Sequence, residues 1–375
     1  MSTKRLIYLE TIRGIASIVV VFHHFILGFF PLLENSVTHG GLKYTPLYPL
    51  INGNGAVAFF FVLSGFVLTR KYYQKFSFSD LISSVIKRLP RLWLPVGISM
   101  LIGAAVLIYT PELHIEAARL THSDWLADFA SAGLPQYQFF PSFSDAAQNS
   151  LFVFLEPGYY YYNSSLWTMV WEFRGSIIVF LLVYVINIIF NKNNCLVIVI
   201  HSLLSIICFM LKEFNFYIPF LIGSLIAFIH SRKPDIFLLS RPLVNILFMV
   251  TIFLFSADKW ILVTPASTIA IILLLSVPSL EKRLSNPIGL FLGRLSFPLY
   301  LVHVPLMLSV TCFTYISLVE MGLPVWSIIL LCFIITWGVS LLAAWPLMAL
   351  EKIWVPTINR WSQSLVKNLA LYRNR

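Results

Sequence analysis

Long apolar runs alternate with short polar segments along the whole chain. They lie near residues 6–30, 54–70, 90–109, 166–190, 195–211, 216–231, 242–257, 260–278, 290–316 and 324–350. A helix of about 20 apolar residues crosses the roughly 30 Å hydrocarbon core of a bilayer. A helix also satisfies its backbone hydrogen bonds internally, so it is the stable form of such a segment in lipid. The pattern predicts an all-α, polytopic membrane protein with about ten transmembrane helices.

Basic residues in the polar segments predict the orientation. Lysine and arginine gather in the cytoplasmic loops of membrane proteins, and here they concentrate in alternate segments, of which 70–88 and the C-terminal tail hold five each. The intervening segments hold only Lys43, Arg119, Lys212 and Lys259. An even number of spans with both termini cytoplasmic fits this alternation, and it places the longest loop, about 110–165, outside. Orientation therefore explains the net charge of +10, and no nucleic acid partner is expected.

Composition supports a chain that lives in lipid. The sequence is 58% hydrophobic and 11% charged, whereas a soluble domain is roughly 45–50% apolar and about 25% charged. Residues 1–375 are therefore expected to form a single membrane domain, multi-pass in the plasma membrane or an endomembrane, with the lipid bilayer as its surroundings. The four cysteines show no CxxC spacing, so neither a metal site nor a disulfide framework is expected.

The first apolar run carries ionisable residues in "RGIASIVVVFHHF", Arg13 to Phe25. Such side chains are costly in the membrane interior and mark a functional site by default. At about 100° per residue, Arg13 and His24 share one helix face, which Glu10 also borders, and His23 points about 80° away. An imidazole can take a proton from a hydroxyl near neutral pH, and it can equally relay protons in a transporter. His24 is the predicted base, with His23 beside it.

Two further segments place charges at the ends of spans. "KRLPRLWLP" puts Arg88 and Arg91 one turn apart, a spacing that suits phosphate binding as well as plain cytoplasmic anchoring. "SLWTMVWEFRGS" puts Glu172 and Trp167 at the outer end of the fourth run. Glu172 is expected to meet His24 as its orienting carboxylate.

Polar residues recur in "LGRLSFPLYLVHVPL" of the ninth run and in the outer loop. Ser296, Tyr300 and His303 are spaced for one side of a helix, so they are predicted to be walls of the site, although interhelical hydrogen bonding explains them as well. The aromatic "GYYYYN" of the loop fits an interfacial belt or a cover over an outward-facing site. Asn163 in "NSS" matches a glycosylation sequon.

Five segments, taken in order, resemble the acyltransferase 3 family of integral membrane acyltransferases. "LETIRGIASIVVVFHH" is similar to the family's first-span pattern "LDGLRGLAALLVVLFH", and "AFFFVLSGFVLT", "KRLPRLWLP", "SLWTMVWEF" and "GRLSFPLYLVHVPL" follow it. The matches extend over nearly the whole chain. The resemblance implies transfer of an acyl group, usually acetyl from acetyl-CoA, to a hydroxyl of a carbohydrate, lipid or other small acceptor.

The resemblance also implies roles for single residues. The family's essential histidine lies eleven residues after its arginine, which corresponds to His24 and Arg13. The family's arginine pair corresponds to Arg88 and Arg91 as a clamp for the CoA phosphates, and its fourth-span glutamate to Glu172. The sequence departs from the family where glutamate replaces aspartate at position 10, where a serine–tyrosine pair reads "SF" at 296–297, and where "EKP" reads "EKI" at 351–353.

The resulting hypothesis is a membrane O-acyltransferase with acyl-CoA as donor and no tightly bound cofactor. His24 would deprotonate the acceptor hydroxyl, oriented by Glu172 or Glu10, while Arg13 stabilises the negative charge that develops. Direct transfer and a covalent acyl-enzyme both stay open. The residues predicted to bind substrate are Glu10, His23, Trp167, Ser296, Tyr300 and His303. The alternative is a multi-pass transporter that uses intramembrane His and Glu residues as a proton relay.

Overall fold

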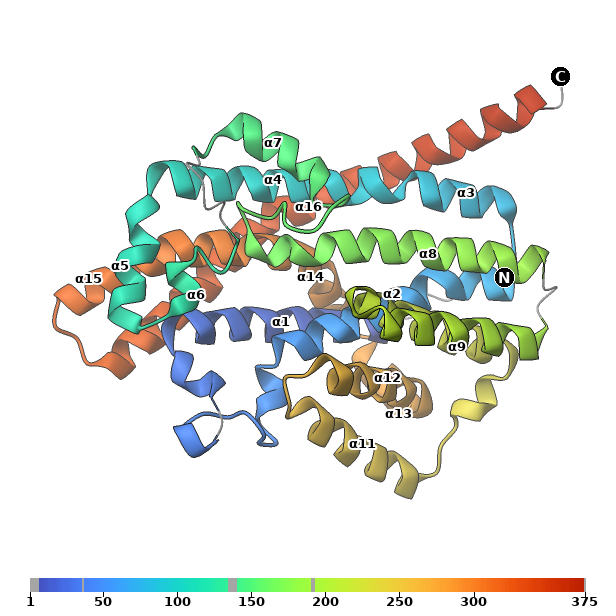
Figure 1. The fold of residues 1–375 in the computed structure, drawn as a ribbon, viewed down its shortest axis with the longest axis horizontal. Helices are drawn as coiled ribbons and strands as arrows, with labels where there is room; N and C mark the ends of the chain where they lie inside the picture. Colours follow the sequence, from blue (N-terminus) through green and yellow to red (C-terminus); the bar gives the residue numbers. More distant parts are fainter. Residues whose placement is uncertain (1–6, 36, 134–139, 190–192, 374–375) are drawn as a thin grey trace.

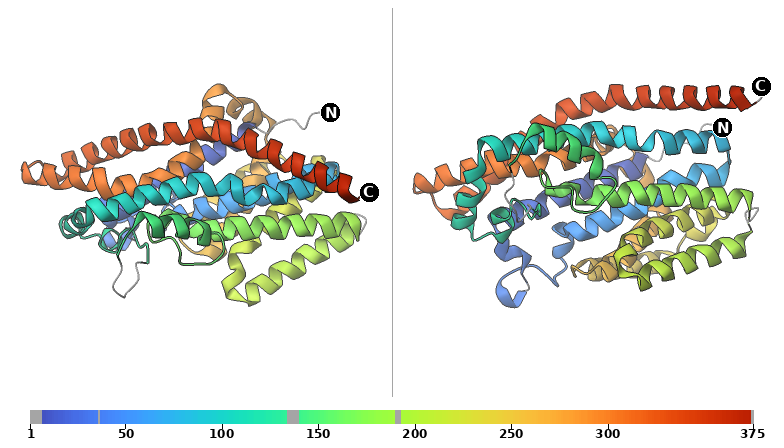
Figure 2. Two further views of the ribbon diagram at one scale, coloured as in Figure 1. Left: turned by 90° about the horizontal axis from the view of Figure 1, so that it is seen from above. Right: turned by 45° about the horizontal axis from the view of Figure 1, so that its top comes forward.

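The computed structural model describes residues 7–35, 37–133, 140–189 and 193–373, which form helices and no strand. The long helices run side by side in an elongated bundle (Figures 1 and 2). The α-helices, long and short, are α1 Ile7–Phe29, α2 Gly53–Gln74, α3 Phe78–Ile86, α4 Arg88–Tyr109, α5 Pro111–Thr121, α6 Asp124–Ala127, α7 Phe143–Phe152, α8 Met169–Ile188, α9 Asn194–Met210, α10 Ile218–Arg232, α11 Arg241–Phe255, α12 Trp260–Ser276, α13 Pro278–Leu284, α14 Pro287–Leu306, α15 Cys312–Glu320 and α16 Val325–Arg373. The all-α prediction is confirmed.

Each predicted apolar run falls on a helix, but the helices differ in length. Among the described residues, seven helical stretches are long and apolar enough to cross a membrane, and α12 with α13 add an eighth if their 90° bend lies within one span. Helix α11 has 15 residues, which at 1.5 Å per residue extend about 22 Å, less than the roughly 30 Å hydrocarbon core. The multi-pass architecture is therefore established, whereas the count of about ten stays a prediction.

Small residues bring the central helices into backbone contact. A Cβ atom at Gly65 of α2 would lie 2.2 Å from the carbonyl oxygen of Phe220, and one at Gly223 of α10 would lie 2.0 Å from that of Val62. Helices in lipid associate through such close packing, since the hydrophobic effect gives them little reason to pair. Helices α2 and α10 therefore form a closely packed pair.

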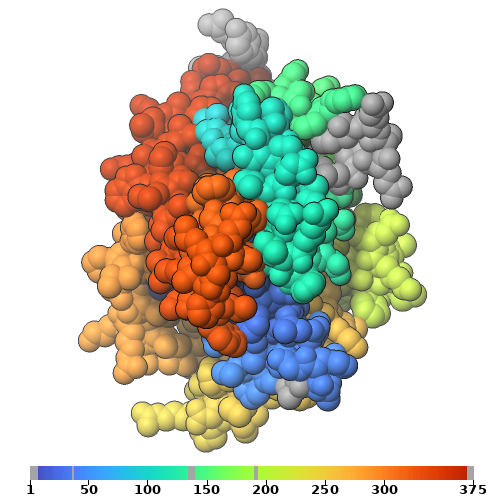
Figure 3. All heavy atoms as spheres, turned by 90° about the vertical axis from the view of Figure 1, so that its left-hand side faces the viewer, coloured from blue at the N-terminus to red at the C-terminus, as the bar shows by residue number. Residues whose placement is uncertain are grey.

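The outer loop covers one end of the bundle. Helices α5 and α6 lie where α1 ends, and α7 lies along α4 (Figure 1). Figure 3 looks onto this end, where α5, α15 and the segment after α1 close over the helices behind them. Helix α1 begins and α16 ends toward the opposite end (Figure 2). This agrees with two termini on one side of the membrane, although the cytoplasmic assignment stays a prediction.

Candidate functional site

Two cavities lie on either side of the short 3₁₀ helix η4, Ser164–Thr168. The first, the large cavity, has a volume of about 970 Å³ and is lined by residues of α1, α2, α4, α8, α14 and α16. The second, the histidine cavity, has about 180 Å³ and is lined by His23 and His24 together with residues of the outer loop. Thr168 lines the large cavity and its neighbour Trp167 lines the histidine cavity. The end of η4 therefore lies between the two.

The predicted site residues divide between these cavities. The large cavity is lined by Glu10, Arg13, Arg88, Arg91, Glu172, Ser296 and Tyr300. The histidine cavity is lined by His23, His24 and Trp167. Eleven residues of helix separate Arg13 from His24 by about 16 Å along α1. The structure does not bring the two residues together, because a shared helix face still leaves residues three turns apart along the axis, so a joint action on one reacting carbonyl stays a prediction.

His24 is held between α14 and the outer loop. Its Nδ1 lies 2.7 Å from Nε2 of His303, and Nδ1 of His303 lies 3.1 Å from the carbonyl oxygen of Leu299. The ring of Trp125 in α6 lies 5.3 Å from the His24 ring with the planes 12° apart. His303 itself is fully buried, at 0% exposure. It lies behind His24, so its predicted role as a substrate contact is not what the geometry supports.

Arg13 joins α1 to α14 at the other end of the same face. Its guanidinium donates from Nε to Oγ of Ser296 at 3.0 Å and from Nη2 to the carbonyl oxygen of Gly293 at 2.7 Å. Glu10, one turn earlier, pairs with it at 2.8 Å. The predicted common face of Arg13 and His24 is confirmed, because both side chains contact α14. Glu10 cannot orient His24, since it lies fourteen positions earlier in the helix, about 21 Å away along the axis.

Glu172 has partners other than the expected one. Near the start of α8, its carboxylate forms an ion pair with Arg88 and accepts a hydrogen bond from Oγ of Ser64 at 2.9 Å. Arg88 is 7% exposed and also donates to Oγ of Ser176 at 3.0 Å. A buried guanidinium requires a charged partner in a medium of low dielectric constant. Glu172 is therefore bound to Arg88, and the predicted contact with His24 is not made.

This pairing also changes the predicted phosphate clamp. Arg88 donates hydrogen bonds to Glu172 and Ser176. Arg91 is exposed and lines the large cavity, so it is the arginine of the pair that can bind a ligand. Further cations around the same cavity are Arg70, Lys71, Arg294 and Lys352. Among the described residues, seven cationic and three acidic side chains line it, so it carries a net charge of +4. In the sequence, the positive-inside pattern is enough to explain these cations, so the sequence gives no sign that they line one cavity.

Tyr300 forms part of the wall next to η4. Its hydroxyl lies 2.7 Å from Oγ1 of Thr168 and donates to the carbonyl oxygen of Ser165. Its ring centroid lies 6.0 Å from that of His303. Tyr300 therefore fastens α14 to η4 between the two cavities, as a wall residue should.

Asn163 anchors η4 from its other end. Pro305 has no N–H, so the carbonyl oxygen of Leu301 four residues earlier lacks its helical partner. That oxygen accepts from Oγ of Ser99 at 2.7 Å and from Nδ2 of Asn163 at 2.8 Å. Asn163 is 0% exposed. The sequon is therefore part of the folded core and is not accessible for glycosylation.

His23 turns away from His24 toward the start of α2, as the helical spacing predicts. Its Nδ1 lies 2.9 Å from the carbonyl oxygen of Ile51 and 3.7 Å from Oε2 of Glu34. A Cβ atom at Gly53 would lie 2.4 Å from the His23 ring. Burial raises the pKa of the Glu34 carboxyl above its ordinary value. His23 thus holds the segment between α1 and α2 while one side of its ring lines the histidine cavity.

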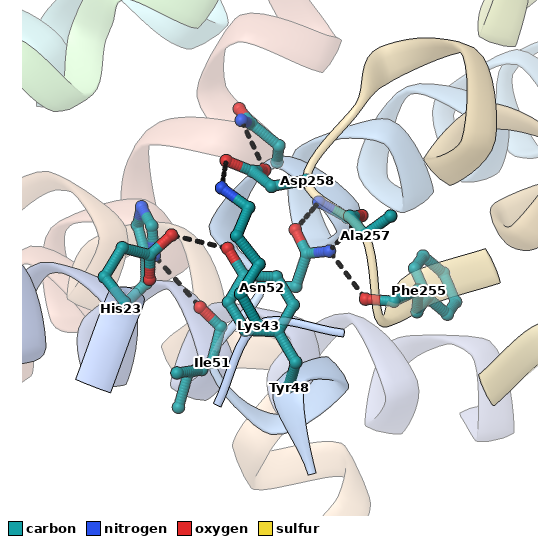
Figure 4. Close-up of polar contacts among 11 residues, drawn as sticks. His23, Lys43, Tyr48, Ile51, Asn52, Phe255, Ala257 and Asp258 are labelled. Carbon is teal, nitrogen blue, oxygen red and sulfur yellow. Dashed lines mark hydrogen bonds and ion pairs between the residues drawn. The ribbon is translucent and has the colours of Figure 1, made fainter. Parts of the chain in front are cut away.

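A polar cluster continues from His23 to the segment between α11 and α12 (Figure 4). Asn52 donates from Nδ2 to the carbonyl oxygens of Phe255 and Ala257 at 2.8 and 3.1 Å. Lys43 pairs with Asp258 at 3.5 Å. These contacts tie two loops together, and they give His23 a fixed support.

The outer loop supplies the rest of the histidine cavity. Trp125, Ala130, Ser131 and Tyr160 line it, so this loop covers the histidine cavity, and its role as a cover over an outward-facing site stays a prediction. Three consecutive residues at the cavity, 129–131, have φ angles of 49°, 59° and 55°. The left-handed conformation costs roughly 1–2 kcal/mol per non-glycine residue, and such strain tends to persist at functional sites. Spacing along the chain gives no signal for any of these contacts.

The fold is a multi-pass helical bundle that holds a half-buried histidine in a small cavity beside a large basic one. The acyltransferase domain family, acyltransferase 3, matches residues 6–345, and the chain belongs to it. The protein is therefore a membrane acyltransferase, a transferase that acts on groups other than aminoacyl groups. No curated protein and no solved structure matches the chain.

Proposed function

We propose that the protein transfers an acyl group, in the first instance acetyl, from acyl-CoA to a hydroxyl of a carbohydrate, lipid or small-molecule acceptor. One observation carries this proposal: His24 lines a small cavity whose described lining holds no Asp, Glu, Lys or Arg, and the end of η4 lies between this cavity and a large, strongly basic one. A charged donor and a neutral acceptor need two such compartments. The catalytic base should lie where the donor compartment and the acceptor compartment meet.

The large cavity suits the donor. Coenzyme A carries its phosphates at one end and its thiol at the end of a long, flexible arm. Arg91, Arg294 and Lys352 line the cavity and are exposed, and guanidinium and ammonium groups bind phosphates through charge-assisted hydrogen bonds. We place the phosphates there. The arm then extends past Thr168 and Tyr300 toward His24.

The histidine cavity suits a neutral acceptor that bears hydroxyl groups. Trp125, Trp167 and Tyr160 offer aromatic surfaces, and Ser131 and Ser164 offer hydroxyls. Aromatic rings with a polar edge bind molecules that are apolar on one side and hydrogen-bonding on the other, as a sugar ring is. The outer loop lines this cavity and covers the end of the bundle that Figure 3 shows, so the acceptor would enter from the predicted outer side.

The chemistry needs one base. His24 takes the proton of the acceptor hydroxyl as its oxygen attacks the thioester carbonyl carbon. The carbon–sulfur bond breaks, and His24 returns the proton to the leaving sulfur, which gives free CoA and the ester. Direct transfer in this form accounts for every proton and bond without a covalent acyl-enzyme.

The test is transfer of radiolabelled acetyl from acetyl-CoA by purified protein in lipid nanodiscs, with mixed glycans and lipids as acceptors. We expect His24→Ala to lower the rate by about 100-fold or more, the usual contribution of a general base. His23→Ala removes the neighbouring imidazole and should keep most of the activity. If no CoA is released, or if His24→Ala is as active as the wild type, the proposal fails and the transporter alternative takes its place.

A further inference from the structure

The contact between His24 and His303 is made edge to edge. The two ring planes are 16° apart and the ring centroids are 5.0 Å apart, while the bonded nitrogens are 2.7 Å apart. A centroid distance this large requires both nitrogens to lie on the line between the ring centres. The hydrogen bond therefore lies in the plane of both rings, where the lone pair of one nitrogen faces the N–H of the other.

The direction of this hydrogen bond follows from the far side of His303. Its Nδ1 faces the carbonyl oxygen of Leu299 at 3.1 Å, and a carbonyl oxygen only accepts, so Nδ1 carries the proton. A neutral His303 then has a lone pair on Nε2. That lone pair accepts the proton on Nδ1 of His24, which leaves Nε2 of His24 unprotonated.

We propose that His303 is a positioning residue that fixes the tautomer of His24. It presents a neutral acceptor that holds the proton on Nδ1 and keeps Nε2 free as the base; this role rests on the proposed function of His24. His303 is fully buried and lies behind the side chain that lines the cavity. It acts through His24 and not on the substrate.

His303 takes the role of orienting His24, for which the sequence predicts a carboxylate. Glu172 is engaged with Arg88, and Glu10 lies about four helical turns from His24. The side chains that face His24 are His23 of α1, with ring centroids 5.4 Å apart, Trp125 of α6 and His303 of α14. Tyr160 of the outer loop lines the same cavity. An imidazole gives His24 an oriented acceptor without a buried negative charge.

Two substitutions separate the tautomer role from simple packing. Glutamine places a neutral amide oxygen near the position of Nε2, so His303→Gln should retain kcat within about tenfold of the wild type. His303→Leu fills the space without an acceptor and should lower kcat by about 100-fold, since a base in the wrong tautomer loses most of its effect. The KM for the donor should stay unchanged in both. Equal losses of kcat in the two variants would overturn the proposal.

The tautomer of His24 can be measured without substrate, so this test does not depend on whether the protein transfers acyl groups. Nitrogen-15 NMR of histidine-labelled protein in lipid reports which ring nitrogen is protonated, and the His24 signals are those lost in His24→Ala. We expect protonated Nδ1 and unprotonated Nε2 in the wild type and in His303→Gln, and mixed tautomers in His303→Leu. Protonated Nε2 in the wild type, or an unchanged tautomer in His303→Leu, would refute the role of His303 even if acyl transfer is found. If no acyl transfer is found, the NMR result stands on its own.

Discussion

Removal of one partner of the Arg88–Glu172 pair should destabilise the protein strongly. The guanidinium is almost fully buried between α4 and α8, and Glu172 also accepts from Ser64 at 2.9 Å. Glu172→Leu leaves an uncompensated buried charge, which costs about 3–5 kcal/mol of unfolding free energy. Arg88→Met leaves the carboxylate in the same position and should cost a similar amount.

The double variant decides the origin of this loss. With both charges replaced by apolar side chains of similar size, no buried charge remains, and such replacements are often neutral. We therefore expect Arg88→Met with Glu172→Leu to recover most of the stability lost by either single variant. The assay is unfolding by SDS in mixed micelles, followed by tryptophan fluorescence.

An exposed ion pair supplies the control. Arg119 pairs with Glu116 at 3.1 Å, with side chains 74% and 45% exposed, and such pairs contribute about 0–1 kcal/mol. Arg119→Ala should therefore change the free energy of unfolding by little. The reasoning is refuted if Glu172→Leu costs no more than this control, or if the double variant loses as much as the sum of the singles.

Three further predictions concern the surroundings of His24. Gly53→Ala places a Cβ atom 2.4 Å from the His23 ring, so it should lower acyl transfer and the melting temperature together; a variant that behaves as wild type would contradict this packing. Asn163 is buried, so glycosidase treatment should leave the electrophoretic mobility of protein from a eukaryotic host unchanged, and a shift abolished by Asn163→Gln would show the reverse. Burial raises the pKa of Glu34 above its ordinary value of 4.5, so the unfolded chain releases this proton first and stability falls as pH rises from 4.5 through the folded pKa. Glu34→Gln should remove that slope in melting temperature, and an unchanged slope would rule Glu34 out as its source.

Periodicity in the sequence predicts much of the fold because it reports directly on local physics. An apolar run must be helical in lipid, and each predicted run is a helix. Spacing by eleven residues places Arg13 and His24 on one face, and both contact α14. The same spacing also implies a separation along the helix axis, which divides these two residues between different cavities.

Partner choice depends on tertiary contacts that the pattern does not contain. Glu172 has Arg88 and Ser64 within reach because α8 packs beside α2 and α4. Trp125 reaches His24 because a loop of many residues folds back over the end of α1. No periodicity links such positions. Hydrophobicity and charge patterns therefore predict helices and orientation, whereas the pairing of polar residues requires the structure.

The central claim is that a basic donor cavity and a neutral histidine cavity have separate tasks. The most direct test measures the binding of radiolabelled acetyl-CoA to nanodisc-embedded wild type, His24→Ala and the double variant Arg91→Ala with Lys352→Ala, together with kcat. We expect His24→Ala to bind the donor as the wild type does and to lower kcat by about 100-fold or more. We expect the double variant to bind at least about tenfold more weakly, since a hydrogen bond to a charged group contributes roughly 1.5–3 kcal/mol, yet to keep its kcat at saturation. Loss of donor binding in His24→Ala, or undiminished binding in the double variant, would contradict this claim.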